Sequence, residues 1–273
     1  YTRTMAQLPY VNDTYRTAPR HISWFARAFP SLTFHSQWIA TILRSCMLAK
    51  RARYGDQEWI DSSLEVLRSL ESVGVQFEID GLNHLRQLET PCLIIGNHMS
   101  SLETTVLPCL IQPLRRITFV VKESLLNYPF FKHVMRSRDP IPVSQTDARQ
   151  DFKAMLDGGT ERLAQGISLV IFPQGQRAAA FDPAKFNTIG IKLAKRAGVP
   201  IIPLALHTSA WSIGRIVSEF GKIKPAQKVR FSFGAPLIVN GRGTDAHEAT
   251  LQFITRNLQE WEEEDRQSVL AVS

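Results

Sequence analysis

Short runs of β-branched and aliphatic residues recur along the chain and alternate with longer helical patterns. The strand-like runs cover residues 75–79, 92–95, 117–121, 168–172, 201–206 and 229–233. Helical patterns lie at residues 102–110, 147–164, 183–197 and 244–264. Because strands alternate with helices, we predict an α/β fold in which helices flank a mixed, largely parallel sheet. In such sheets, ligands usually bind just beyond the carboxyl ends of the strands.

The first 74 residues are predicted to form a helical segment ahead of an α/β domain at residues 75–273. From residue 21 to residue 50, apolar residues recur at three- and four-residue spacing, with Pro30 dividing the run and basic residues flanking it. This pattern predicts two basic amphipathic helices. A further helix is expected at residues 56–72, ending near Gly74.

The positive charge of the chain is concentrated near its start. The formal net charge is +7, and most of the excess lies in the first 60 residues. A basic surface suits nucleic acid, an anionic membrane or a phosphate-bearing substrate. Tryptophans and cations on the two front helices suit the headgroup region of a membrane, although the same pattern describes a helical pair packed on a globular body. Both interpretations stay open on this pattern alone.

The longest charge-free stretch, residues 197–214, contains two prolines and several polar residues, so we expect no integral membrane helix. The three cysteines, Cys46, Cys92 and Cys109, are far apart and form no CxxC pair, and no histidines cluster with them. This arrangement predicts no metal site and favours a reducing compartment.

The first candidate site lies shortly after the strand-like run at residues 92–95. His98 follows this run, and Glu103 comes five residues later, at the start of the next predicted helix. A carboxylate in this place can hold one ring nitrogen of the histidine while the other faces a cleft, which is the arrangement that a general base needs. The alternative is that His98 and Glu103 only cap the helix.

Two further candidates follow other strand-like runs. The run at residues 168–172 leads into Gly175 and Arg177. The glycine lets the backbone approach a ligand closely, and the arginine offers a fixed cation for a phosphate or a developing oxyanion. Lys122 ends the run at residues 117–121 and can face the same cleft. A plain surface turn and a solvated lysine are the alternatives.

The order of these motifs is more informative than any one of them. The chain contains, in succession, NHxxxxE, KESL with PFF, FPxGxR, FNTIG and VPIIP. This succession resembles the four sequence blocks of the PlsC-type glycerolipid acyltransferases, the lysophosphatidic acid acyltransferase family, over about residues 75–233. The resemblance implies a glycerol-3-phosphate acyltransferase-like fold. It also implies transfer of a fatty acyl group from an acyl thioester to a lysophospholipid hydroxyl, by default that of lysophosphatidic acid.

The resemblance implies roles for the candidate residues as well. His98 would act as the general base and Glu103 would orient it. The implied substrate-binding residues are Asn97, Lys122, Gly175 and Arg177. Among these, Lys122 and Arg177 would hold the phosphate of the acceptor, and backbone N–H groups around Gly175 would stabilise the tetrahedral oxyanion.

The implied acyl donor is acyl-CoA or acyl-acyl carrier protein, which leaves acyl carrier protein as an open partner, and no cofactor is implied. Together with the basic front helices, the resemblance predicts a peripheral protein on the cytoplasmic face of a membrane. No nucleic-acid partner is expected, because the sequence contains no recognised binding motif. The absence of GxSxG from the sequence argues against a serine hydrolase.

The chain departs from the family pattern at several positions. Glu103 stands where the family has aspartate, which keeps a carboxylate on an arm one methylene longer. Gln174 and Gln176 replace the glutamate and threonine of the family's FPEGTR block, and Gln145 lies where relatives often carry arginine. These changes leave two alternatives open: an acyltransferase for a non-standard lipid acceptor, and a non-catalytic lipid-binding protein on the same fold.

Overall fold

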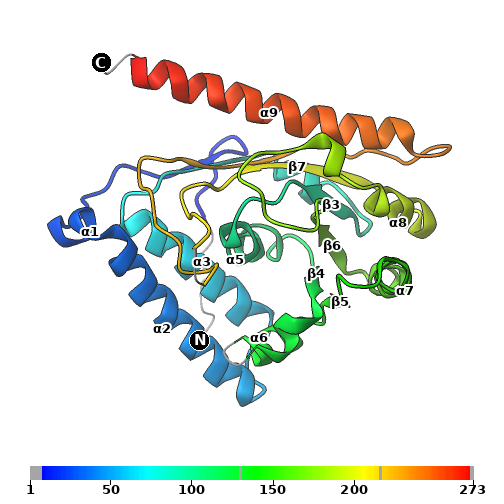
Figure 1. The fold of residues 1–273 in the computed structure, drawn as a ribbon, viewed down its shortest axis with the longest axis horizontal. Helices are drawn as coiled ribbons and strands as arrows, with labels where there is room; N and C mark the ends of the chain where they lie inside the picture. Colours follow the sequence, from blue (N-terminus) through cyan, green and yellow to red (C-terminus); the bar gives the residue numbers. More distant parts are fainter. Residues whose placement is uncertain (1–7, 129–130, 215–216, 271–273) are drawn as a thin grey trace.

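A single sheet forms the centre of the molecule, with helices on both of its faces (Figure 1). The computed structural model describes residues 8–128, 131–214 and 217–270. Within these residues the strands are β1 (Tyr15–Arg16), β2 (Phe77–Asp80), β3 (Leu93–Gly96), β4 (Ile117–Lys122), β5 (Ile141–Val143), β6 (Ser168–Ile171), β7 (Ile201–His207) and β8 (Val229–Phe233). The helices are α1 (Trp24–Ala28), α2 (Pro30–Lys50), α3 (Asp56–Ser72), α4 (Asn83–Arg86), α5 (Ser101–Ile111), α6 (Lys132–Arg136), α7 (Ala148–Ala164), α8 (Ile189–Ala197) and α9 (Thr244–Leu270).

The strands follow the order β1-β2-β8-β7-β3-β6-β4-β5. From β7 to β5, neighbouring strands run parallel, whereas β8 is antiparallel to β7 and β1 is antiparallel to β2. The predicted mixed, largely parallel sheet is therefore confirmed. Ile95 near the end of β3 lies opposite Ile171 of β6 and Pro203 of β7. The loops after β3 and β6 consequently leave the sheet side by side.

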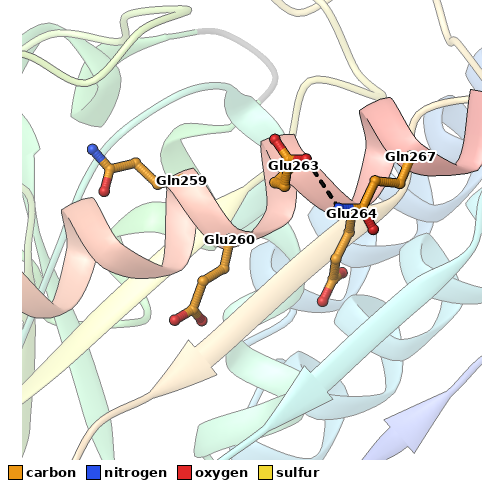
Figure 2. A pocket seen from close by; sticks show the side chains of 5 residues that line it. All are labelled: Gln259, Glu260, Glu263, Glu264 and Gln267. Atoms are coloured by element: carbon orange, nitrogen blue, oxygen red, sulfur yellow. Dashed lines mark hydrogen bonds between the residues drawn. The ribbon is translucent and has the colours of Figure 1, made fainter.

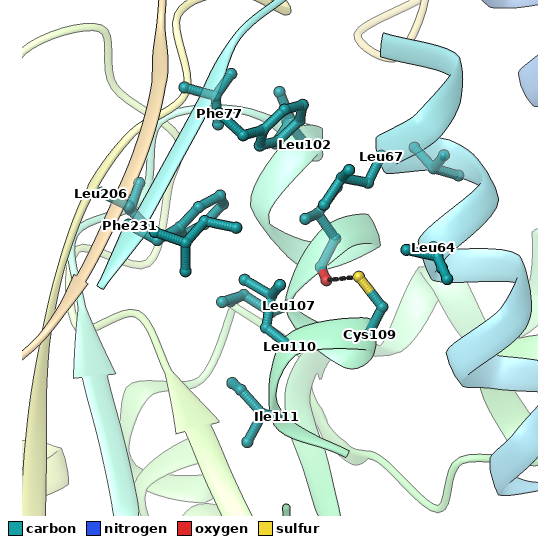
Figure 3. Close-up of a cluster of buried hydrophobic side chains, with 14 of the residues drawn as sticks. Leu64, Leu67, Phe77, Leu102, Leu107, Cys109, Leu110, Ile111, Leu206 and Phe231 are labelled. Carbon is teal, nitrogen blue, oxygen red and sulfur yellow. Dashed lines mark hydrogen bonds between the residues drawn. The ribbon is translucent and has the colours of Figure 1, made fainter. Parts of the chain in front are cut away.

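Successive residues of β3 point to opposite faces of the sheet, as the pleat requires. Ile94 belongs to a core that also contains residues of α2, α3 and α5, whereas Leu93 and Ile95 belong to a second core with residues of α7, α8 and α9. Figure 3 shows the first core, with Leu64 and Leu67 of α3 beside the side chains of α5. Helices thus cover both faces of the sheet, and the site loops emerge at its carboxyl edge, between the two helical layers.

The front helices form where the sequence places them. Ser23 caps α1 by accepting a hydrogen bond from the N–H of Ala26 at 3.2 Å. Pro30 is the first residue of α2, a position where its missing N–H costs nothing. The division at Pro30 and the helix at residues 56–72 are confirmed. The amphipathic character is not, because the outward side of α1 and α2 also carries exposed apolar residues: Trp24, Phe25, Phe29, Leu32, Ile39, Leu43 and Met47.

The division between residues 74 and 75 stays a prediction about domains, although packing crosses it. Tyr15 of β1 pairs with Ile79 of β2, which adds the front segment to the sheet. Glu71 of α3 is fully buried and accepts hydrogen bonds from Tyr15 at 2.5 Å and from Arg20 and Arg68 at 2.9 Å. The front segment and the sheet therefore share one core. The predicted helical segment at residues 1–74 therefore includes a strand, β1, and its residues 1–7 lie outside the described residues.

One predicted helix is wrong in extent. The pattern at residues 183–197 predicts a continuous helix, but the structure has a 3-10 turn at Pro183–Lys185 and starts α8 only at Ile189. Asn187 separates them, because its side chain donates to the carbonyl of Pro173 and accepts from the N–H of Ile189 at 3.0 Å. Within the described ranges, no helix combines the length and hydropathy needed to cross a bilayer.

Candidate active site

Loops from four parallel strands meet at the carboxyl edge of the sheet. His98 follows β3, Gly175 and Arg177 follow β6, Lys122 ends β4, and Thr208 follows β7. This is the edge at which ligands usually bind in parallel sheets. The sequence-predicted residues therefore share one region, and their contacts decide what each can do.

His98 and Glu103 form the pair that the sequence predicts. His98 Nδ1 lies 2.8 Å from Glu103 Oε1, and the histidine side chain is 17% exposed. A carboxylate on Nδ1 leaves the proton on that nitrogen and makes Nε2 the basic atom. No polar atom of the described residues contacts Nε2. Phe172 stacks on the imidazole with ring centroids 4.4 Å apart and 10° between the planes, which restrains the ring further.

The Glu103 carboxylate is fully buried and surrounded by donors. Oε1 accepts from the N–H groups of Met99 at 2.6 Å and Ser100 at 2.8 Å, and Oε2 accepts from the hydroxyls of Ser100 at 3.0 Å and Thr208 at 2.7 Å. Burial opposes ionisation, but the hydrogen bonds from His98, Thr208 and Ser100 outweigh it and lower the pKa of Glu103. The group beside the histidine is therefore a carboxylate at neutral pH.

Glu103 also caps α5. Ser100 is the N-cap residue, and Glu103 at the third helical position bonds back to the Ser100 N–H, which makes a capping box. One side chain therefore makes the helix cap and also bonds to His98, so the cap and the predicted orienting role are compatible. The cap fixes where the carboxylate lies, and the carboxylate fixes the histidine.

Asn97 occupies a different place from the predicted substrate contact. Its side chain is 1% exposed, donates to the carbonyl of Leu206 at 2.8 Å and accepts from the Leu206 N–H at 3.0 Å. The amide therefore bridges the ends of β3 and β7. This geometry favours a role in holding the two strand ends together over a direct contact with substrate.

Gln174 joins the two motif loops, a role that sequence reasoning missed. Its side-chain oxygen accepts a hydrogen bond from the backbone N–H of His98 at 2.9 Å. The backbone adds a second link, from the N–H of Ala178 to the carbonyl of His98 at 2.9 Å. A glutamine oxygen accepts such a bond as a glutamate oxygen does, but without a charge. The departure at this position thus leaves the link between the loops in place.

Gly175 forms the turn of the second motif loop. Its φ of +71° lies in the left-handed region that glycine adopts without strain. Its N–H donates to the carbonyl of Phe172 at 3.0 Å, so this one of the N–H groups around Gly175 is already engaged in the turn. Its carbonyl accepts from Gln145 at 3.1 Å. The backbone N–H groups of Gln176 and Arg177 meet no acceptor among the described residues, which makes them the better candidates.

Arg177 reaches back to the start of α5. Its guanidinium donates to the hydroxyl of Ser101 and, at 3.2 Å, to the hydroxyl of Ser218, and it lies 3.5 Å from Glu219 Oε1. Ser101 is only three residues after His98. The predicted phosphate-binding cation therefore lies close to the predicted general base, with hydroxyl groups around it.

Lys122 is exposed and stands apart from these contacts. Among the residues that the structure describes, its ammonium group makes no hydrogen bond or ion pair. It shares the carboxyl edge with His98 and Arg177, and the structure records no contact between it and either residue. Its predicted role in binding the acceptor stays a prediction.

Several site residues carry no signal in the sequence. Three of them are Thr208, Ser218 and Glu219, which lie more than 100 residues after the His98 motif. No recognised sequence block contains them, so they reach the site only through folding. His207, the neighbour of Thr208, bonds through its ring nitrogens to the Lys228 carbonyl and the Ser209 hydroxyl. Thr208, and not His207, therefore contacts the His98–Glu103 pair.

A hollow elsewhere on the surface offers no comparable chemistry. The hollow has a volume of about 450 Å³ and is lined by residues of α9: Gln259, Glu260, Glu263, Glu264 and Gln267. Figure 2 shows these acidic and amide side chains along the helix. Glu260, Glu263 and Glu264 each pair with an arginine. These residues form a solvated helix face, and none of them is a predicted site residue.

Comparison with known proteins agrees with the motifs. The acyltransferase family model matches residues 76–207. A 1-acyl-sn-glycerol-3-phosphate acyltransferase of Pseudomonas aeruginosa is 32% identical over 196 residues, which cover 72% of this chain and 72% of that protein. One of Haemophilus influenzae is 25% identical over 134 residues, which cover 46% of this chain and 55% of that protein.

The fold has a counterpart among solved structures. The crystal structure of the 1-acyl-sn-glycerophosphate acyltransferase PlsC from Thermotoga maritima aligns with a TM-score of 0.66 at 15% identity, covering 85% of this chain and 94% of that chain. This likeness supports the predicted fold. The ordered motifs and the Pseudomonas aeruginosa relative together show that the chain belongs to the PlsC-type 1-acyl-sn-glycerol-3-phosphate acyltransferase family.

Proposed function

We propose that this protein transfers a fatty acyl group from an acyl thioester to the free hydroxyl of lysophosphatidic acid, which yields phosphatidic acid. The observation that carries the proposal is the His98–Glu103 pair at 2.8 Å, which leaves Nε2 of His98 without a hydrogen-bond partner among the described residues, while Arg177 bonds to Ser101 at the start of α5. The names of the relatives support the same reaction. The hydrogen bond from His98 to Gln174 gives one of the two glutamine departures a structural role, which supports the catalytic alternative over a non-catalytic protein.

In the proposed mechanism, Nε2 of His98 takes the proton from the acceptor hydroxyl as its oxygen attacks the thioester carbonyl. Glu103 holds the ring and stabilises the imidazolium that forms. The tetrahedral intermediate collapses by breaking the carbon–sulfur bond, and the thiolate takes the proton from His98. The acyl group passes directly to the acceptor, so the mechanism includes no acyl-enzyme. Free N–H groups after Gly175 would stabilise the oxyanion, an effect often worth about 3 kcal/mol per donor.

The acceptor's phosphate is assigned to Arg177, with Lys122 as an outer cation. Arginine binds phosphate through parallel N–H bonds, whereas lysine acts as a point charge. The hydroxyl of Ser101 beside Arg177 can donate to the same phosphate. The reaction needs no cofactor, and the donor is acyl-CoA or acyl-acyl carrier protein.

The outward side of α1 and α2 supports peripheral attachment to the cytoplasmic face of an anionic membrane. Trp24 is 77% exposed, Leu32 61% and Met47 55%, and Arg27 and Lys50 lie exposed on the same helices. An apolar surface with flanking cations suits the boundary between headgroups and acyl chains. Attachment there would let a lysolipid reach the site without leaving the membrane.

Thiol release tests the reaction. Wild type is mixed with palmitoyl-CoA in detergent micelles, with and without lysophosphatidic acid, and compared with His98→Ala and a matched control, His84→Ala. Release should require the acceptor and should fall about 10³-fold in His98→Ala, the size of a lost general base, while His84→Ala stays at the wild-type rate. Wild-type turnover in His98→Ala would rule out the mechanism. A wild type inactive with both acyl-CoA and acyl-acyl carrier protein would rule out the reaction.

Vesicle sedimentation tests the membrane proposal separately. A triple variant with Trp24, Leu32 and Met47 changed to serine is compared with Ile238→Ser, which alters a 66% exposed apolar residue elsewhere on the surface. On vesicles of equal parts phosphatidylglycerol and phosphatidylcholine, the triple variant should bind roughly tenfold more weakly because it loses buried apolar area. Equal binding of the triple variant and the control would contradict the proposal.

A further inference from the structure

A carboxylate lies against the arginine that we assign to the acceptor's phosphate. Glu219 Oε1 is 3.5 Å from the Arg177 guanidinium, and the Ser218 hydroxyl connects them by accepting from Arg177 at 3.2 Å and donating to Glu219 at 2.7 Å. We propose that Glu219 is a specificity-determining residue that competes with the acceptor's phosphate for Arg177. This inference rests on the function proposed above.

The Arg177–Glu219 ion pair is placed where a phosphate can replace the carboxylate on the guanidinium. Across the described residues, Glu219 is the carboxylate that lies within ion-pair distance of Arg177. The side chains of Arg177 and Glu219 are 26% and 25% exposed, so both remain accessible to solvent. Phosphate oxygens accept from the same guanidinium donors as a carboxylate. A phosphate that binds Arg177 therefore has to displace Glu219, whose side chain can then turn to water.

The backbone of Glu219 is held in place by contacts that do not depend on its side chain. Its carbonyl accepts a hydrogen bond from Trp211 Nε1 at 2.9 Å. Two residues later, the Gly221 carbonyl lies 2.9 Å from His35 Nε2 of α2. A Cβ at Gly221 would come within 1.5 Å of the Ser212 carbonyl oxygen, so the tight turn beside Glu219 requires glycine. The loop thus keeps the carboxylate within reach of Arg177.

Competition of this kind changes which acceptors the site favours. Every acceptor that uses Arg177 has to break the ion pair with Glu219, whereas an acceptor without an anionic headgroup does not. After displacement, the carboxylate still repels a nearby dianion. Glu219 therefore weakens the binding of phosphate-bearing lysolipids relative to uncharged ones.

A double-mutant cycle tests the proposal on the full chain. KM and kcat are measured with lysophosphatidic acid for wild type, Glu219→Gln, Arg177→Ala and the double variant, and calorimetry follows the binding of soluble hexanoyl-lysophosphatidic acid without turnover. Glu219→Gln should lower KM and the dissociation constant about fivefold, the size of a partly exposed ion pair, with little change in kcat. In the Arg177→Ala background the same substitution should have no effect. Glu248→Gln on the exposed face of α9 is the matched control.

The outcomes distinguish a failure of the Glu219 competition from a failure of the proposed phosphate site at Arg177. If Arg177→Ala raises KM but Glu219→Gln leaves it unchanged or raises it, the competition is refuted and the phosphate site stands. An effect of Glu219→Gln that persists without Arg177 also refutes the competition. If Arg177→Ala leaves both KM and the dissociation constant unchanged, the assignment of the phosphate to Arg177 fails, and the inference fails with it.

Discussion

The two halves of the candidate site differ in how firmly they are held. On one side, the Glu103 carboxylate is fully buried and bonds to His98, Met99, Ser100 and Thr208. On the other side, Arg177 is partly exposed and contacts side chains of a long loop. A general base has to keep one orientation through the reaction, whereas a cation that binds substrate has to exchange its partner in every turnover. The contrast fits the roles that we propose, with His98 and Glu103 serving chemistry and Arg177 serving binding.

The largest effect on turnover should come from a change in the buried half of the site, at Glu103. Glu103→Gln keeps the shape of the side chain but removes the charge that stabilises the imidazolium. We expect kcat to fall roughly 10²-fold, with a small change in the acceptor KM. Glu71→Gln is the control, because Glu71 is also fully buried and bonded to several donors but lies away from the site. A similar loss of kcat in both variants would mean that the effect is structural.

The same substitution should remove a pH-dependent contribution to stability that the wild type has. The pKa of Glu103 in the folded protein lies below its ordinary value of 4.5, so its stabilising effect is complete above that pH and is lost as the pH falls through the folded pKa. The free energy of urea unfolding should be about 2 kcal/mol lower for Glu103→Gln at pH 7. The difference should shrink below pH 4.5. A difference that stays constant down to pH 3 would contradict the assignment of the charge.

A change at Arg177, in the partly exposed half of the site, should alter acceptor binding and leave the rate of the chemical step nearly unchanged. Arg177→Lys retains a positive charge but loses the planar fork that can bond two phosphate oxygens. The acceptor KM should rise about tenfold while kcat stays within a factor of two or so. Steady-state kinetics with varied lysophosphatidic acid distinguishes the two parameters. A fall in kcat as large as that of Glu103→Gln would erase the contrast between the halves.

A smaller effect is expected at the link between the halves. Gln174→Ala removes the acceptor for the His98 N–H, and kcat should fall about threefold to tenfold, the cost of one hydrogen bond. Gln174→Glu keeps an acceptor oxygen and should fall less. The comparison of kcat for the two variants measures the hydrogen bond itself. Equal losses would show that the bond to His98 is not what Gln174 contributes.

The smallest effect should arise at the outer cation. Lys122 is exposed, so salt and water screen its charge, and Lys122→Ala should raise the acceptor KM only about twofold to threefold. The increase should disappear in 0.5 M salt, since the Debye length there is only about 4 Å. An effect that is larger than that of Arg177→Lys would reverse the order of the two cations.

Local patterns predicted most of the fold. The helix at Asp56–Ser72 and the strand Val229–Phe233 agree with the predicted limits, because each has strong periodicity and clear ends. The strands Tyr15–Arg16 and Ile141–Val143 were missed, since two or three residues at a sheet edge carry no periodicity. The break at Asn187 was missed because the partner that stops the helix, Pro173, comes from another loop.

The candidate site shows the same limit. His98 and Glu103 are close in sequence, so their spacing was enough to predict the contact. The turn at Gly175 was predicted, but the use of its N–H within that turn was not. Glu219 reaches Arg177 from a loop 42 residues further along the chain, and no motif announces it. Sequence patterns thus located the groups to which we assign the reaction, and only the folded chain reveals what surrounds them.

The double use of Glu103 has a consequence for how such an enzyme can change over time. One carboxylate closes the first turn of α5 and orients the histidine, so the start of a supporting helix and the geometry of the base cannot be altered independently. Heating that frays this helix end should abolish turnover at the same temperature. Mutations that change which substrates bind should therefore cost less stability around Arg177 than around His98.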